Sequence, residues 1–216
     1  MRFSAFFLIG FLPLSSVVFA APREHRGTYF SVGTGIAYNS FHVFETEDDG
    51  FYIDGRYEYV TSKNKWEFGG WTFPALDFRF GRSVGNAVAI YGDFNFFMAS
   101  GELKAHEETW ENGLGVFGCA GIGVEVYPFR NPNSFLRGFH FGHTYSFGAD
   151  FASFDDGENA HAYGMGVFLR TNLGMDWWVS DTWMIGVEIS YMSPSVRMEN
   201  LKEKDSFQLL FRITRG

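Results

Sequence analysis

Large apolar residues alternate with small or polar residues along most of the chain. Phe30, Val32 and Ile36 fall on one parity, whereas Ser31 and Gly35 fall on the other. A repeat of two residues is typical of a β-strand, because successive strand side chains point to opposite faces. The alternation recurs in eight stretches, which predict eight strands: 30–39, 76–81, 88–96, 114–126, 139–151, 163–176, 183–191 and 207–214.

The connections between these stretches are alternately long and short. In chain order they are 42–70, 83–86, 100–112, 128–134, 153–160, 179–181 and 193–205. Transmembrane barrels of bacterial outer membranes have this asymmetry, with long external loops, short periplasmic turns and an even number of strands. The pattern therefore predicts an all-β fold, an eight-stranded antiparallel up-and-down transmembrane β-barrel.

The amino terminus has the three parts of a secretory signal peptide. Arg2 supplies a positive charge, residues 5–14 form an apolar run, and Val18 and Ala20 are small residues at the positions that a signal peptidase requires. A membrane anchor needs about 18 to 25 continuous apolar residues, and this run is shorter. We expect cleavage after Ala20, so that residues 1–20 are the signal peptide and residues 21–216 form the barrel domain.

The distribution of glycine indicates which face of the barrel is interior. Nearly all strand glycines lie on the polar parity, and Gly92 and Gly118 are the clear exceptions. The interior of an eight-stranded barrel is just wide enough to be filled by side chains, so small residues belong there. The polar face is therefore predicted inside and the apolar face outside, against lipid. A soluble lipocalin-like carrier, with the two faces exchanged, is the alternative.

The mature chain resembles the small outer-membrane barrels of the OmpA transmembrane-domain and OmpX type. The resemblance covers residues 28–214 and depends on the strand pattern rather than on a catalytic motif. It implies a location in the bacterial outer membrane, reached through the periplasm. Such proteins usually end on an aromatic residue that the assembly machinery recognises, and this chain departs from that pattern because it ends Arg215-Gly216.

Charged residues on the polar parity are predicted to form an ion-pair network inside the barrel, because buried charges must be paired. Arg79 is expected near Asp93, and Arg212 near Glu188, since each pair lies on consecutive strands. A filled interior leaves little space for a substrate, which disfavours a catalytic carboxylate pair there. The predicted interior network comprises Asp77, Arg79, Asp93, Glu125, Arg170, Asp176, Glu188 and Arg212, with His140 as a further candidate.

Aromatic residues near the strand ends are predicted to form the girdles that flank the apolar band of a membrane barrel. Ordinary core packing is the alternative interpretation. The residues are Tyr38, Trp71, Phe97, Tyr127, Trp177, Trp178, Trp183 and Tyr191.

Candidate catalytic and metal-binding residues are few. A lipid-modifying enzyme would need a serine and a histidine on the lipid-facing wall, but His143 points outward whereas its neighbour Ser146 points inward. The six histidines show no short ligand spacing, and the single cysteine, Cys119, is expected to be a small buried residue. The sequence predicts no enzymatic activity, no cofactor and no metal.

Composition and charge limit the choice of partners. The formal net charge of −8 disfavours nucleic acid, which needs a basic surface. The predicted external loops are acidic, with balances of −4 over 42–70 and −3 over 100–112. Outer-membrane lipid and lipopolysaccharide are the expected neighbours, and loops 42–70 and 100–112 could bind a cationic or carbohydrate ligand. Aromatic residues in the first loop could instead continue the strands above the membrane.

The predicted function is that of a monomeric outer-membrane barrel with a structural or surface-interaction role, a plugged polar interior and acidic external loops. An outer-membrane lipid-modifying enzyme, the soluble carrier and a narrow channel are the alternatives. Ligand identity is not specified by any motif.

Overall fold

The structure is a computed structural model of the 216-residue chain. It describes residues 27–53, 56–85, 87–105, 108–129, 131, 134–153, 161–198 and 201–215. The predicted signal peptide, residues 1–20, lies outside the described residues. Within them, no helix is long and apolar enough to cross a membrane.

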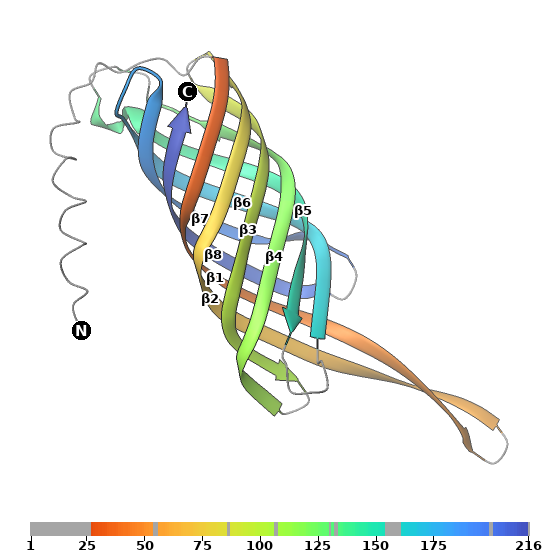
Figure 1. The fold of residues 1–216 in the computed structure, drawn as a ribbon. Coiled ribbons are helices and arrows are strands. Elements are labelled where there is room, and N and C mark those ends of the chain that lie inside the picture. The colour runs from red at the N-terminus through yellow and green to blue at the C-terminus, as the bar shows by residue number, and fades with distance from the viewer. Residues whose placement is uncertain are drawn as a thin grey trace, which may run out of the picture.

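Eight strands form one closed antiparallel barrel in which each strand pairs with the next along the chain and β8 pairs with β1. Closure places the first and last strands side by side (Figure 1). This confirms the predicted fold. The strands are β1 (Gly27–Ile53), β2 (Arg56–Val84), β3 (Val88–Ala105), β4 (Glu108–Val126), β5 (Phe139–Ser153), β6 (His161–Trp178), β7 (Trp183–Met198) and β8 (Leu201–Arg215), and a short 3₁₀ helix, η1 (Phe135–Gly138), precedes β5.

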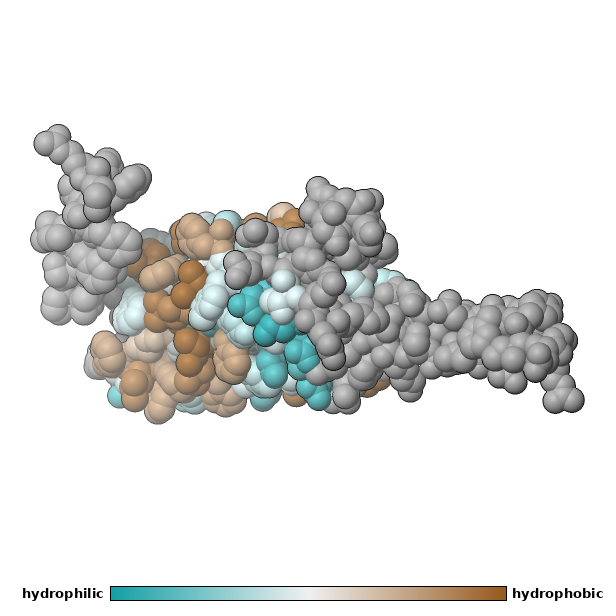
Figure 2. Space-filling view, turned by 90° about the horizontal axis from the view of Figure 1, so that it is seen from below, coloured by the Kyte–Doolittle hydropathy of each residue, from teal (hydrophilic) through white to brown (hydrophobic). Residues whose placement is uncertain are grey.

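The two faces of the wall have the predicted orientation. In β5 the burial alternates residue by residue along the whole strand. Outward side chains such as Phe80, Ile122 and Phe211 are at least 65% exposed, whereas the inward charged residues are buried. Figure 2 shows hydrophobic residues gathered over the wall at the left of the view and hydrophilic residues further to the right. An apolar exterior on a closed hydrogen-bonded wall requires lipid around it, so the chain is a transmembrane barrel of the outer-membrane type.

The barrel has two different ends. Gly27 and Arg215 lie at the end where β2–β3, β4–β5 and β6–β7 are connected, which we call the terminal end. The other four connections lie at the opposite end, which we call the hairpin end. There the β1–β2 hairpin projects well beyond the barrel (Figure 1).

The sequence predicted four long loops at the hairpin end, and for three of them the prediction is wrong because most of their residues are strand. Residues 42–70 are mostly paired strand, since the β1–β2 register continues from Val43 opposite Trp66 to Ile53 opposite Arg56. The β3–β4 ladder likewise extends through most of 100–112, and β7 and β8 cover most of 193–205. The sequence loses its apolar alternation where the wall leaves the membrane, but backbone pairing does not need apolar side chains. Residues 154–160 of the fourth predicted loop lie outside the described residues.

The predicted aromatic girdle is correct only in part. Trp71, Trp177, Trp183 and Tyr191 are exposed on the outer face, and Tyr38 is half-buried there. The prediction is wrong for three residues, which lie on the interior parity and are buried: Phe97, Tyr127 and Trp178. Proximity to a strand end indicated the position of these rings along the barrel axis, but not whether they lie on the inner or the outer face.

Two glycines of β4 provide a test of the face assignment. A Cβ atom on inward Gly121 would lie 2.1 Å from the carbonyl oxygen of Tyr145 and 2.5 Å from Cα of Ser146, so the neighbouring strand would have to move. A Cβ atom on outward Gly118 would meet only Phe96, at 3.7 Å. We expect Gly121→Ala to destabilise the barrel by about 1–3 kcal/mol, the usual cost of overpacking. The midpoint of urea unfolding, followed by loss of the compact band on SDS gels, measures this cost.

Gly118→Ala is the matched control and should leave that midpoint unchanged. Equal sensitivity at the two positions would contradict the assignment of Gly121 to a crowded interior.

Candidate functional site

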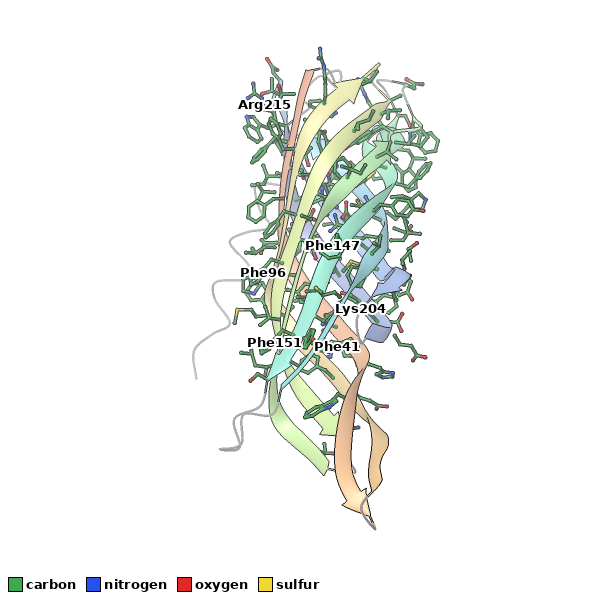
Figure 3. The ribbon with its side chains drawn as sticks, turned by 90° about the vertical axis from the view of Figure 1, so that its right-hand side faces the viewer. Phe41, Phe96, Phe147, Phe151, Lys204 and Arg215 are labelled. Atoms are coloured by element: carbon green, nitrogen blue, oxygen red, sulfur yellow. The ribbon has the colours of Figure 1, made fainter. Side chains whose placement is uncertain are left out.

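The interior of the barrel contains two layers of side chains. The layer nearer the terminal end, which we call the charge layer, holds all eight residues of the predicted network. Every one of them is at most 5% exposed. The layer nearer the hairpin end, which we call the aromatic layer, holds Lys204 among the rings of Phe41, Phe68, Phe97, Phe117 and Phe168. Figure 3 shows Phe41 and Lys204 toward the hairpin end, away from Arg215.

Arg79 of β2 contacts four carboxylates of the charge layer. Its Nε lies 2.9 Å from Oδ2 of Asp77 on the same strand, and 3.5 Å from Oδ1 of Asp93 on β3. Its terminal nitrogens donate to Glu125 at 2.8 Å and to both oxygens of Glu188, at 2.5 and 2.9 Å. Glu125 and Glu188 come from β4 and β7, so one guanidinium links strands on different sides of the lumen.

Arg170 of β6 neutralises the two aspartates at the edge of this group. Nη1 donates to Oδ1 of Asp77 at 2.7 Å, and Nη2 donates to Oδ1 of Asp93. The two aspartates are thereby shared between Arg79 and Arg170. A shared arrangement of this kind compensates each carboxylate by more than one cation, which buried charges require.

Arg212 of β8 occupies the opposite side of the charge layer. Nη1 donates to Glu188 and lies 3.3 Å from Oε2 of Glu125, while Nη2 donates to the Tyr29 hydroxyl at 2.7 Å. Nη1 also lies 2.8 Å from Nε2 of His140. The two pairs expected on neighbouring strands, Arg79 with Asp93 and Arg212 with Glu188, are therefore both in contact in the structure.

Asp176 is contacted by two aromatic side chains of the charge layer, those of Tyr127 and His140. The Tyr127 hydroxyl donates to Oε1 of Glu125 at 2.6 Å and lies 3.3 Å from Oδ2 of Asp176. Nδ1 of His140 lies 3.6 Å from the same Asp176 oxygen. Sequence reasoning missed Tyr29, Tyr91 and Tyr127 as members of this layer. Their interior parity in the alternation was the signal that could have identified them.

Three ligand atoms of the charge layer lie close enough together to hold a metal ion. Oxygens or nitrogens of Glu125, His140 and Asp176 all lie within 4.8 Å of one another. The same Glu125 carboxylate already accepts from Arg79 and Arg212, and Nε2 of His140 faces Arg212. A metal cation would compete with two guanidinium groups at this position, so the geometry favours the ion-pair network.

The aromatic layer encloses the buried ammonium group of Lys204. Nζ of Lys204 lies 3.7 Å from the ring centroid of Phe117 and 5.4 Å from that of Phe168, distances at which cation–π attraction operates. The ammonium donates to Oδ1 of Asp150 at 2.5 Å and to Oδ1 of Asn39 at 2.8 Å. Sequence reasoning assigned Lys204 to an external loop and so missed it, because a single lysine beyond the apolar alternation carried no pattern.

Cys119 and His143 have the faces that the alternation predicts. Cys119 is a free, buried thiol on the interior face. His143 is exposed on the lipid-facing wall, and its Nδ1 lies 3.0 Å from the Thr171 hydroxyl oxygen of β6. The sequence around His143 does not contain this partner, because Thr171 comes from the adjacent strand.

Comparison with known proteins finds similar structures but no similar sequence family. No family model matches the chain, and no curated protein matches it in sequence. Among solved structures, the attachment invasion locus protein Ail of Yersinia pestis is 13% identical, with a TM-score of 0.48 over 88% of this chain and 99% of that one. A proposal for the function must therefore be based on the side chains of this protein.

Two further structures are described as outer membrane proteins. AlkL, in lipid bilayers, is 12% identical, with a TM-score of 0.44 over 91% of this chain and 92% of that one. OprG of Pseudomonas aeruginosa is 14% identical, with a TM-score of 0.41 over 88% of this chain and 97% of that one.

Proposed function

We propose that the chain is a non-enzymatic barrel of the bacterial outer membrane whose interior is closed and whose hairpin end serves surface contacts. The filling of the lumen is the observation that carries this proposal. Arg79, Arg170 and Arg212 of the charge layer are each less than 2% exposed, as are the principal rings of the aromatic layer. Two consecutive layers of this kind fill the described part of the lumen, and we expect them to close it to a hydrated solute.

The distribution of polarity argues against the soluble carrier. Such a carrier would hold its ligand in an apolar interior and present polar side chains to water. In this barrel the half of the interior near the terminal end is ionic, and the wall around it is apolar. The interior therefore serves to hold strands together rather than to receive a ligand.

The surface role is supported by the hairpin end. Backbone pairing carries β1 and β2 beyond the last residue at which β1 contacts β8. The sequence of this extension is acidic, as is that of residues 100–112. Side chains of 43–65 lie outside the described residues, so the proposal of a cationic or carbohydrate ligand, or of lipopolysaccharide bridged by divalent cations, depends on charge alone. We expect the barrel to act as a monomer.

The membrane location is tested by fractionating bacteria that express the full chain. We expect the protein in the outer-membrane fraction, migrating on SDS gels as a compact species that shifts only after boiling, because a closed barrel resists SDS at room temperature. Recovery as a soluble periplasmic species would contradict the proposal.

The closed lumen is tested with proteoliposomes. The purified barrel should give no more sugar-driven swelling than protein-free liposomes, because both layers would have to part for a sugar to pass. A general porin reconstituted in parallel confirms that the assay detects an open lumen. Rapid flux through this protein would show that the layers do not close it.

The structural importance of the charge layer is tested with Glu188→Gln. This change leaves the guanidinium groups of Arg79 and Arg212 short of one buried counter-charge, and breaking a buried ion pair costs about 3–5 kcal/mol. The free energy of unfolding in urea should fall by this order. Glu102→Gln is the control, because Glu102 and Lys104 form an ion pair on the surface, where such pairs contribute little. An unchanged midpoint for Glu188→Gln would remove the support for a structural network.

A further inference from the structure

A polar pair interrupts the lipid-facing wall of β5 and β6. His143 and Thr171 both point outward, are exposed, and are hydrogen-bonded to each other across the strand ladder. Along β5 the nearest outward neighbours of His143 are Phe141 and Tyr145, which are 41% and 54% exposed. Along β6 the outward Leu173 follows Thr171. The pair is therefore flanked by apolar residues along both strands, and the girdle residue Tyr191 lies opposite Thr171 on β7.

One hydrogen-bonding position of this pair faces the lipid. Only one ring nitrogen of a neutral histidine is bonded to Thr171, and among the residues that the structure describes no partner is found for Nε2 of His143. If Thr171 donates, Nε2 carries the proton and is a free donor; if Nδ1 donates, Nε2 is a free acceptor. Hydrocarbon cannot satisfy either, and an unsatisfied polar group there costs free energy. An intramembrane histidine is for this reason a marker of a binding site.

An apolar groove adjoins the pair on the side of the terminal end. It has a volume of about 270 Å³ and crosses four strands, with Leu173 of its lining two residues from Thr171 on the same face. Gly174 and Glu188 also line it, from interior positions of their strands, and the Glu188 carboxylate is bonded to Arg79 and Arg212 inside the barrel. The groove is lined on its outer side by Phe139, Leu173, Met175, Val187, Ile189 and Leu209.

We propose that the groove and the His143–Thr171 pair form a binding site for an acyl chain that carries an uncharged hydroxyl group along its length. The chain occupies the apolar groove, and its oxygen bonds to Nε2 of His143. A groove open to the hydrocarbon of the bilayer is filled by lipid chains, which supply the apolar part of the ligand. A carboxylate is disfavoured as the bonding group because an ionised group within the hydrocarbon of the bilayer is costly. The site depends on the membrane location proposed above.

The test uses two fatty acids that differ by one hydroxyl group. The barrel is reconstituted in nanodiscs of dimyristoylphosphatidylcholine and titrated with 12-hydroxystearate or with stearate, while ¹⁵N NMR follows the His143 ring. The His143→Phe protein identifies this signal by its loss. We expect 12-hydroxystearate to shift the ring resonance at roughly three- to tenfold lower concentration than stearate, the range that one net hydrogen bond provides.

Two variants separate this site from general lipid contact. Thr171→Val keeps the shape of the wall but removes the hydrogen bond that holds the His143 ring. We expect the ratio of the stearate and 12-hydroxystearate concentrations that shift the ring resonance to fall below about two. Phe147→Leu changes an exposed lipid-facing residue on β5 on the far side of His143 from the groove and should preserve the preference. Both proteins should retain heat-modifiable migration, because neither change affects the interior.

Several outcomes would overturn the site. Equal titration by both fatty acids would show that the pair does not bind a hydroxyl group. Full selectivity in Thr171→Val would show that His143 binds it without Thr171, which overturns the pair as the site. Loss of a dimer in His143→Phe, with no lipid preference in the parent protein, would assign the pair to a contact between two copies of the chain. Absence of a heat-modifiable species in the nanodiscs would instead refute the membrane barrel on which the site depends.

Discussion

Closure of the hydrogen-bond ladder between β1 and β8 is the constraint on which the rest of the structure depends. With eight strands, closure leaves an interior only wide enough for side chains, so each inward position must fit its neighbours from across the lumen. Closure also removes every strand edge within the wall, which permits an exterior that faces hydrocarbon. The same ladder thus separates an ionic interior from the surrounding lipid by a single layer of strands.

The two interior layers meet this constraint by different means. The charge layer joins β2, β3, β4, β6, β7 and β8 through three guanidinium groups, each shared by at least two carboxylates. The aromatic layer fills space with rings and holds one ammonium group among them. In both layers the charged side chains are buried and form ion pairs with other side chains of the barrel.

The sequence alone was sufficient for the strand number, the two faces and the eight charged residues of the interior. Period-two alternation specifies whether a side chain points inward or outward, but not its position along the barrel axis. It could therefore not show that Arg79 contacts Glu188, which lies across the lumen on β7. For the same reason it could not place Lys204 among phenylalanine rings, or bring Thr171 beside His143 from another strand. These contacts depend on register and strand tilt, which arise only when the sheet closes.

The extended β1–β2 hairpin differs from the wall in one respect. Beyond Val43 on β1 and Trp66 on β2, the described strands pair only with each other, so this two-stranded ribbon has two open edges. Open edges present backbone N–H and C=O groups to which an extended peptide can add as a further strand. Acidic residues are frequent along this ribbon. Like charges of neighbouring copies would repel one another, so the charge that could attract a basic partner also opposes edge-to-edge aggregation of the protein with itself.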